Sequence, residues 1–170
     1  MERITATYFI ETQYAPEKAA AVLAGEQSSG TFVAVPGETE ELKQRFAARV
    51  ESVEVLETVN EPAIPGATSK DGKYHRAIVK VSWSIENFGY NLPVMVSTLQ
   101  GNLYEITQFT GLKLMEIDLP ASFGNHYKGP AFGIEGCRTL TGVQGRPMIG
   151  TIIKPNVGLS AEETGDLAGR

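Results

Sequence analysis

Cysteine, histidine and long apolar runs are scarce in this sequence of 170 residues. Cys137 is the only cysteine, which excludes an internal disulfide and is typical of a reducing cytoplasm. The two histidines lie far from it in the sequence, so no zinc site of the usual ligand spacing is predicted. No apolar run approaches the roughly 18 residues of a membrane-spanning helix, and the first residues lack the pattern of a secretion signal. We therefore expect a cytoplasmic protein with no membrane partner.

Clustered positive charge is missing as well. The net charge is -5, and lysine and arginine form no cluster that could neutralise a phosphate backbone, which excludes nucleic acid as the main partner. No acidic loop has the ligand spacing of a calcium-binding loop. A site in which oxygen ligands hold a hard cation is still compatible with the sequence. The hydrophobic fraction of 42% and the charged fraction of 21% are typical of a globular protein with one ordinary domain and a short extension.

Residues 1–120 carry the pattern of an α+β domain. Alternation and β-branched composition predict strands at 4–10, 50–59, 77–84 and 111–119, with a short extended piece at 31–35. Helical periodicity and helix-start residues predict helices at 16–26, 40–46 and 92–100. Setting the short helix aside, the order is strand, helix, strand, strand, helix, strand. This order is the split βαβ pattern of a ferredoxin-like sandwich, whose sheet has one face closed by two helices.

The third predicted strand fixes the expected register of the core. Its apolar side chains alternate with mostly polar ones, so they should face the two helices. They are Ala77, Val79, Val81 and Trp83, and their expected partners are Met95, Leu99 and Leu23. Gly101 is expected to end the second helix, because glycine tolerates the left-handed conformation found there.

The sequence changes character after the domain. Residues 121–147 have no clear period and are interpreted as a connector. The apolar run 148–153 is typical of a parallel strand buried on both faces, and Ser160 to Glu163 has the capping-box spacing of a new helix. Residues 148–170 therefore resemble the first unit of a β/α barrel or of a wound sheet. Because one unit cannot close a barrel, we expect a piece of a longer protein, whose lone strand is poorly ordered or takes its contacts from another chain.

Four positions are candidates for chemistry. Lys154 follows the predicted barrel strand, where barrel enzymes gather catalytic groups, and could stabilise an enolate or bind a phosphate. Its position fits a solvent-facing lysine equally well. Gly30 followed by Thr31 could present donors to a phosphate, although an ordinary turn is the simpler interpretation. Glu26 is most simply a surface carboxylate, and Asn102 a local cap beside a helix end.

Several stretches together resemble the RuBisCO large-chain family over nearly the whole sequence. Residues 127–134 (YKGPAFGI) resemble the linker that precedes the family's barrel. Residues 145–160 (GRPMIGTIIKPNVGLS) are similar to its first barrel strand and the loop that follows. Residues 26–32 (EQSSGTF) and 101–102 resemble the two stretches with which the family's N-terminal domain reaches a neighbouring active site.

The resemblance implies roles for six residues. The implied catalytic residues are Lys154, Glu26 and Asn102, and the implied substrate-binding residues are Thr31, Phe32 and Asn156. Thr31 would bind a phosphate, Lys154 would lie beside the enediolate, and Asn102 would lie against the substrate and a magnesium ion. Glu26 would pair with a lysine on a mobile barrel loop that this chain lacks. The family's sites are shared between the subunits of an antiparallel homodimer. The magnesium ligands, a carbamylated lysine and two acidic residues, would lie further along the barrel.

Two departures from the family favour its RuBisCO-like (form IV) branch. Carboxylating members have a second lysine where this chain has Asn156, and tryptophan where it has Phe32. Losing a cation beside the reacting centre costs a few kcal/mol of transition-state stabilisation. We therefore expect magnesium-dependent enolisation-type chemistry, namely isomerisation, tautomerisation or decarboxylation, on a phosphorylated sugar or sugar acid. Methylthio-sugar enolase chemistry, for which a lysine near the position of Asn102 is expected, is less favoured.

The alternatives are an authentic ribulose-bisphosphate carboxylase large chain and a non-catalytic assembly domain. Because the implied metal ligands and the general base lie outside the chain, we expect the isolated fragment to be inactive.

Overall fold

The computed structural model describes residues 2–29, 36–67, 69–150, 152–154 and 158–169. The chain divides into two compact units, Met1–Tyr127 and Lys128–Arg170. The candidate side chains Glu26 and Asn102 belong to the first unit.

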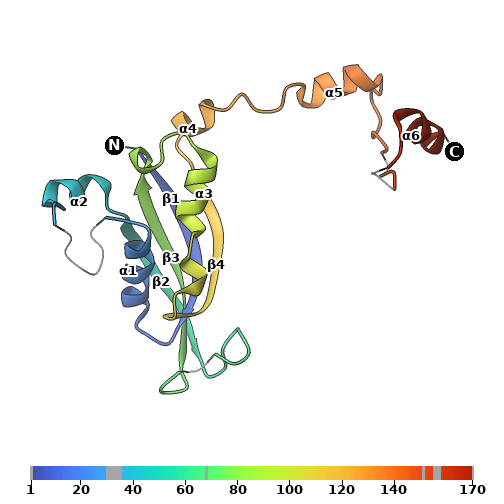
Figure 1. The fold of residues 1–170 in the computed structure, drawn as a ribbon. Coiled ribbons are helices and arrows are strands. Elements are labelled where there is room, and N and C mark those ends of the chain that lie inside the picture. The colour runs from blue at the N-terminus through green and yellow to red at the C-terminus, as the bar shows by residue number, and fades with distance from the viewer. Residues whose placement is uncertain (1, 30–35, 68, 151, 155–157, 170) are drawn as a thin grey trace. The chain divides into compact units, whose positions relative to one another are not determined.

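The first unit is a four-stranded antiparallel sheet with helices on one face (Figure 1). The strands are β1 (Arg3–Thr12), β2 (Arg49–Val59), β3 (Tyr74–Ser84) and β4 (Phe109–Asp118). Their order across the sheet is β2-β3-β1-β4. Helices α1 (Pro16–Glu26) and α3 (Leu92–Gln100) pack on the core face. The predicted ferredoxin-like sandwich is confirmed.

Short elements complete this unit. They are α2 (Glu40–Phe46), the 3-10 helices η1 (Ile85–Asn87) and η2 (Leu103–Glu105), and α4 (Ala121–Asn125). Local sequence explains where the helices begin. Pro16 occupies the first turn of α1, where its missing N–H costs nothing. The Asn91 side chain accepts a hydrogen bond from Val94 N at 3.1 Å and so caps α3.

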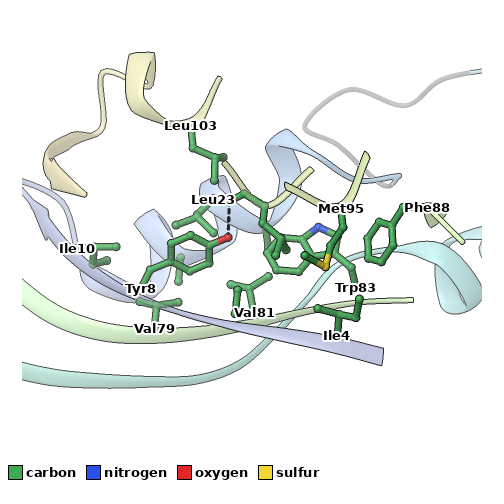
Figure 2. Packing of buried hydrophobic residues seen from close by; sticks show 14 of the residues in the cluster. Ile4, Tyr8, Ile10, Leu23, Val79, Val81, Trp83, Phe88, Met95 and Leu103 are labelled. Carbon is green, nitrogen blue, oxygen red and sulfur yellow. Dashed lines mark hydrogen bonds between the residues drawn. The ribbon is translucent and has the colours of Figure 1, made fainter. Parts of the chain in front are cut away.

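The core lies between β1, β3 and the two helices (Figure 2). Ile4, Ala6, Tyr8 and Ile10 stand opposite Trp83, Val81, Val79 and Ala77, and all eight side chains are fully buried. Leu23, Met95 and Leu99 belong to the same cluster. The predicted register of β3 is therefore confirmed, since a slip of one residue would have exposed Trp83.

Tyr8 joins the sheet to the end of α3. Its hydroxyl donates a 2.6 Å hydrogen bond to the Leu99 carbonyl, one of the carbonyls that a helix end leaves unpaired. Burial raises the pKa of Tyr8, which keeps the hydroxyl protonated as a donor. The bond anchors α3 two residues before Gly101, where the chain turns toward Asn102.

We expect Tyr8→Phe to lower the free energy of unfolding by about 1–3 kcal/mol, because the buried Leu99 carbonyl would lose its donor. Urea denaturation monitored by circular dichroism measures the change. Tyr14→Phe is the matched control, since Tyr14 is 43% exposed and should change stability by less than about 0.5 kcal/mol. Equal effects of the two substitutions would contradict the anchoring role of Tyr8.

The second unit contains helices α5 (Gly133–Thr141) and α6 (Ala161–Ala168). The capping box predicted for α6 is confirmed, with the Ser160 and Glu163 side chains each bonded to the other residue's backbone N–H. The segment interpreted as a connector without a clear period proves partly helical, since α4 and α5 both form within it.

The strand predicted over 148–153 is wrong for the described residues of that run. Residues 148–150, 152 and 153 belong to no strand, and Ile149 and Ile152 are 97% and 80% exposed. The physical reason is that a parallel strand is held by hydrogen bonds from its neighbours. Within the described part of the chain, the one sheet lies in the other unit and does not include this run. That the run takes its contacts from another chain stays a prediction.

Candidate functional site

The structure brings Glu26 and Asn102 together, although 76 positions separate them in the sequence. Asn102 Nδ2 donates a 2.6 Å hydrogen bond to Glu26 Oε1. Glu26 is the last residue of α1, and Asn102 follows α3 by two residues. Both side chains are half-buried. The sandwich topology therefore makes one polar cluster from two candidates that the sequence identified separately.

Gln27 completes this cluster. Its Nε2 donates a hydrogen bond to Asn102 Oδ1, so both ends of the Asn102 amide are engaged. The backbone carbonyl of Gln27 accepts a 3.3 Å hydrogen bond from Trp83 Nε1. A fully buried indole thus holds the backbone of a residue whose side chain reaches the candidate site. Sequence reasoning gave Gln27 no role, because it lay inside the matched stretch 26–32 without a chemical signal of its own.

Gly101 allows this close approach. Its φ of 25° and ψ of -126° lie in a region that favours glycine. A Cβ atom there would stand 2.7 Å from the Ser97 carbonyl oxygen and 2.8 Å from Gln27 Nε2. The prediction that Gly101 ends α3 is confirmed. The simpler interpretation of Asn102 as a local cap is wrong, because its side chain makes no capping bond at η2 and binds Glu26 and Gln27 instead.

Asn102 also lines an open hollow on the surface. Among the described residues, Gly101, Tyr104 and Glu105 also line it, and its volume is about 490 Å³. This volume falls in the range of small-molecule sites. A ligand in the hollow would lie beside Asn102, whose amide is held by hydrogen bonds to Glu26 and Gln27.

Ser28 fixes the beginning of the stretch that resembles the family's phosphate-binding loop. Its hydroxyl accepts a 2.6 Å hydrogen bond from Ala48 N, next to the start of β2, and donates one to the Ser29 carbonyl. Among the residues that the structure describes, the buried Ser29 hydroxyl has no hydrogen-bond partner. Thr31 and Phe32, the expected substrate-binding residues of this stretch, lie outside the described residues, so the structure does not test them.

The other two expected site residues follow the apolar run 148–153. Lys154 is an exposed residue of the second unit, and it does not end a strand as the sequence predicted. Asn156 lies outside the described residues. Of the six expected site residues, the structure thus brings Glu26 and Asn102 into contact, and the roles of all six stay predictions.

The described residues do not build a complete metal site. No group of three or more histidine, cysteine, aspartate or glutamate side chains gathers within the described part of the chain. Glu26 and Asn102 offer carboxylate and amide oxygens. This type of ligand suits magnesium, but two residues are too few to enclose the ion.

Among the helices that the structure describes, none has the length and apolar character needed to cross a membrane.

Comparisons with known proteins agree with this architecture. Residues 2–123 match the family model described as ribulose bisphosphate carboxylase large chain, N-terminal domain. A 3-oxo-isoapionate-4-phosphate transcarboxylase/hydrolase of Xanthobacter autotrophicus is 54% identical over 163 residues. The match covers 96% of this chain and 39% of the relative. A 3-oxo-isoapionate-4-phosphate decarboxylase of Rhizobium etli is 46% identical, with 98% of this chain and 40% of the relative covered.

The solved structure of a rubisco-like protein from Burkholderia fungorum superimposes on the chain with a TM-score of 0.80 and 39% sequence identity. The match covers 98% of this chain and 39% of that protein. The chain thus spans about two fifths of the length of the relatives it matches. With its sandwich fold and with the family model covering most of its length, the chain belongs to the ribulose bisphosphate carboxylase large-chain family, in its RuBisCO-like branch.

Proposed function

We propose that this chain is the N-terminal part of a RuBisCO-like enzyme that acts on a phosphorylated sugar or sugar acid by enolisation-type chemistry. The contact between Glu26 and Asn102 carries the proposal, because it joins the two stretches through which the family's N-terminal domain is expected to reach an active site. The names of the relatives from Xanthobacter and Rhizobium support a phosphorylated 3-oxo sugar acid as the substrate class. Asn156 disfavours the alternative, an authentic carboxylase, since it removes one expected cation.

A 3-oxo acid explains why an enolate-stabilising site suits decarboxylation. When the bond between the carboxylate and C2 breaks, carbon dioxide leaves and the electron pair is delocalised onto the C3 oxygen. A proton then adds to C2. The Lys154 ammonium is proposed to stabilise the developing oxyanion. Asn102 would orient the substrate through its amide, and Thr31 would hold the phosphate.

We propose further that the whole protein is a cytoplasmic homodimer with active sites shared between subunits, and that it requires magnesium. The open hollow beside Asn102 supports a site completed by other residues, since the described part of the chain gathers no group of three or more histidine, cysteine, aspartate or glutamate side chains that could hold the metal. Magnesium would be held by barrel residues outside this chain, with Asn102 near it. When bound, it would supply Lewis-acid polarisation of the substrate's oxygen atoms.

Mixing two inactive variants of the longer protein tests the shared site. We expect Asn102→Ala and Lys154→Ala homodimers each to be nearly inactive with 3-oxo-isoapionate-4-phosphate and magnesium. After subunit exchange, heterodimers should have one site with both substitutions and one with neither. Random exchange makes half of the dimers mixed, so activity should recover to roughly a quarter of the wild-type value.

Three results would count against the proposal. No recovery after demonstrated subunit exchange would place each active site within one chain. Full activity of the Asn102→Ala homodimer would favour the non-catalytic assembly domain. Turnover of the longer protein that persists in the presence of EDTA would remove the magnesium requirement.

A further inference from the structure

We propose that Gln27 is a positioning residue, which fixes the orientation of the Asn102 side-chain amide and so decides which of its groups faces the ligand. This inference rests on the proposed function for the role of Asn102 in turnover. The contact itself is independent of that function, because all three side chains of the cluster belong to the described part of the first unit.

The Glu26 carboxylate gives the hydrogen-bond chain its direction. A carboxylate only accepts hydrogen bonds, so the atom of Asn102 that faces Glu26 must be the donor Nδ2. Oδ1 then points to the other side and needs a donor. Gln27 Nε2 supplies that donor. The chemistry of the Glu26 and Gln27 side chains thus determines which end of the Asn102 amide faces each of them. With both bonds made, the amide has no freedom to turn over.

Two features of the core hold Gln27 in place. The Trp83 indole N–H binds its backbone carbonyl at 3.3 Å. Gly101 leaves room for its side chain, because a Cβ atom at that position would lie 2.8 Å from Gln27 Nε2. Gln27 is therefore anchored to the fold at its backbone and to Asn102 at its tip.

The hydrogen-bond donors and acceptors that Asn102 has left define what its side chain offers a substrate. One hydrogen of Nδ2 is used by Glu26 and one lone pair of Oδ1 by Gln27. Beyond these two bonds the amide has one further N–H donor and one further lone pair, and Asn102 lines the hollow. The N–H suits a carbonyl or carboxylate oxygen of a sugar acid. Turning the amide over would exchange the donor and the acceptor and so present the wrong group.

Three side chains of similar length separate positioning from space filling at residue 27. Gln27→Met removes the donor, and Gln27→Glu replaces it with an acceptor, which would compete with Glu26 for the NH2 group of Asn102. If Gln27 only fills space, both variants should behave like the wild type. If it positions Asn102, Glu should be more harmful than Met. Gln44→Met is the matched control, because Gln44 is exposed on α2.

The first measurement uses NMR spectroscopy of this 170-residue chain, with the Asn102 side-chain signals assigned by their loss in Asn102→Ala. In the wild type and in Gln44→Met, we expect two well-separated NH2 signals with slow solvent exchange. In Gln27→Met and Gln27→Glu, the separation should shrink and solvent exchange should rise about tenfold or more, the factor that corresponds to one lost hydrogen bond. Unchanged Asn102 signals in both variants would overturn the inference.

The second measurement is turnover by the longer protein. We expect kcat/KM to fall about 10–100-fold in Gln27→Met and further in Gln27→Glu, the size typical of residues that orient a functional group from behind. Altered NMR signals with unchanged turnover would confirm the positioning of Asn102 but refute its proposed role in the reaction. The two measurements therefore distinguish a failure of the positioning inference from a failure of the proposed function.

Discussion

Replacing Lys154 with alanine in the longer protein is expected to lower kcat by about a hundredfold or more while KM changes much less. An ammonium beside an enolate acts on charge that develops only on the way to the transition state. Removing it therefore reduces kcat and kcat/KM together, whereas a lysine that only binds the substrate phosphate would raise KM. Steady-state kinetics with 3-oxo-isoapionate-4-phosphate, in magnesium and over a range of substrate concentrations, measures both parameters.

The matched control is Lys70→Ala, since Lys70 is an exposed lysine of the loop between β2 and β3. It should leave both parameters close to the wild-type values. A Lys154→Ala variant that retains its kcat but has a strongly raised KM would reassign Lys154 to phosphate binding. A variant with wild-type values for both would return Lys154 to the solvent-facing lysine that its position alone allowed.

The fold of the first unit could be predicted because its signals are local. The alternation from Ala77 to Trp83 sets which face of β3 is buried, and Pro16 and Gly101 mark the ends of helices within a few residues of sequence. The strand expected at 148–153 failed for the opposite reason. Its apolar composition is a property of the sequence, but its hydrogen bonds must come from neighbouring strands, and the described part of the chain provides none beside it.

The candidate site could be predicted only in part. Glu26 and Asn102 were found through a family resemblance, whereas their contact depends on how α1 and α3 pack. The sequence does not predict a role for Gln27, because its partner lies 75 positions away and a lone glutamine carries no chemical signal. It does not predict the role of Glu11 either. A glutamate at the end of a strand predicts a solvated carboxylate, yet its side chain is fully buried.

Glu11 is the most deeply buried charge described in the first unit, and three groups donate hydrogen bonds to it. Its carboxylate accepts hydrogen bonds from Ala63 N at 2.8 Å, Arg76 Nε at 2.8 Å and the Thr110 hydroxyl at 2.9 Å. Arg76 also binds the exposed Glu57 at 2.9 Å. These bonds join β1 to β3, to β4 and to the loop after β2. Glu11 therefore holds the end of the sheet together.

We expect Glu11→Ala to lower the free energy of unfolding by about 3 kcal/mol. Arg76 keeps Glu57 as a partner, so the loss comes from Ala63 N and the Thr110 hydroxyl, at about 1.5 kcal/mol for each bond to a charged group. Urea denaturation of the 170-residue chain measures it. Glu57→Ala is the matched control, because Glu57 is 55% exposed and its pair with Arg76 should contribute less than about 1 kcal/mol. If Glu11→Ala lowered the free energy of unfolding no more than Glu57→Ala does, Glu11 would not hold the end of the sheet together.

The pH dependence of stability separates the charge of Glu11 from its shape. Burial alone would raise the pKa of the carboxyl, but the hydrogen bonds from Ala63 N, Arg76 and Thr110 outweigh it and hold the pKa below the usual 4.5. A lowered folded-state pKa means that the unfolded chain takes up the proton first as the pH falls. The contribution of Glu11 is then complete above about pH 4.5 and is lost as the pH drops through the folded-state value. Glu11→Gln keeps the shape but cannot ionise, so its unfolding free energy should fall less steeply than that of the wild type in acid. Parallel curves for the two proteins would mean that the acid sensitivity of the fold arises at other carboxylates.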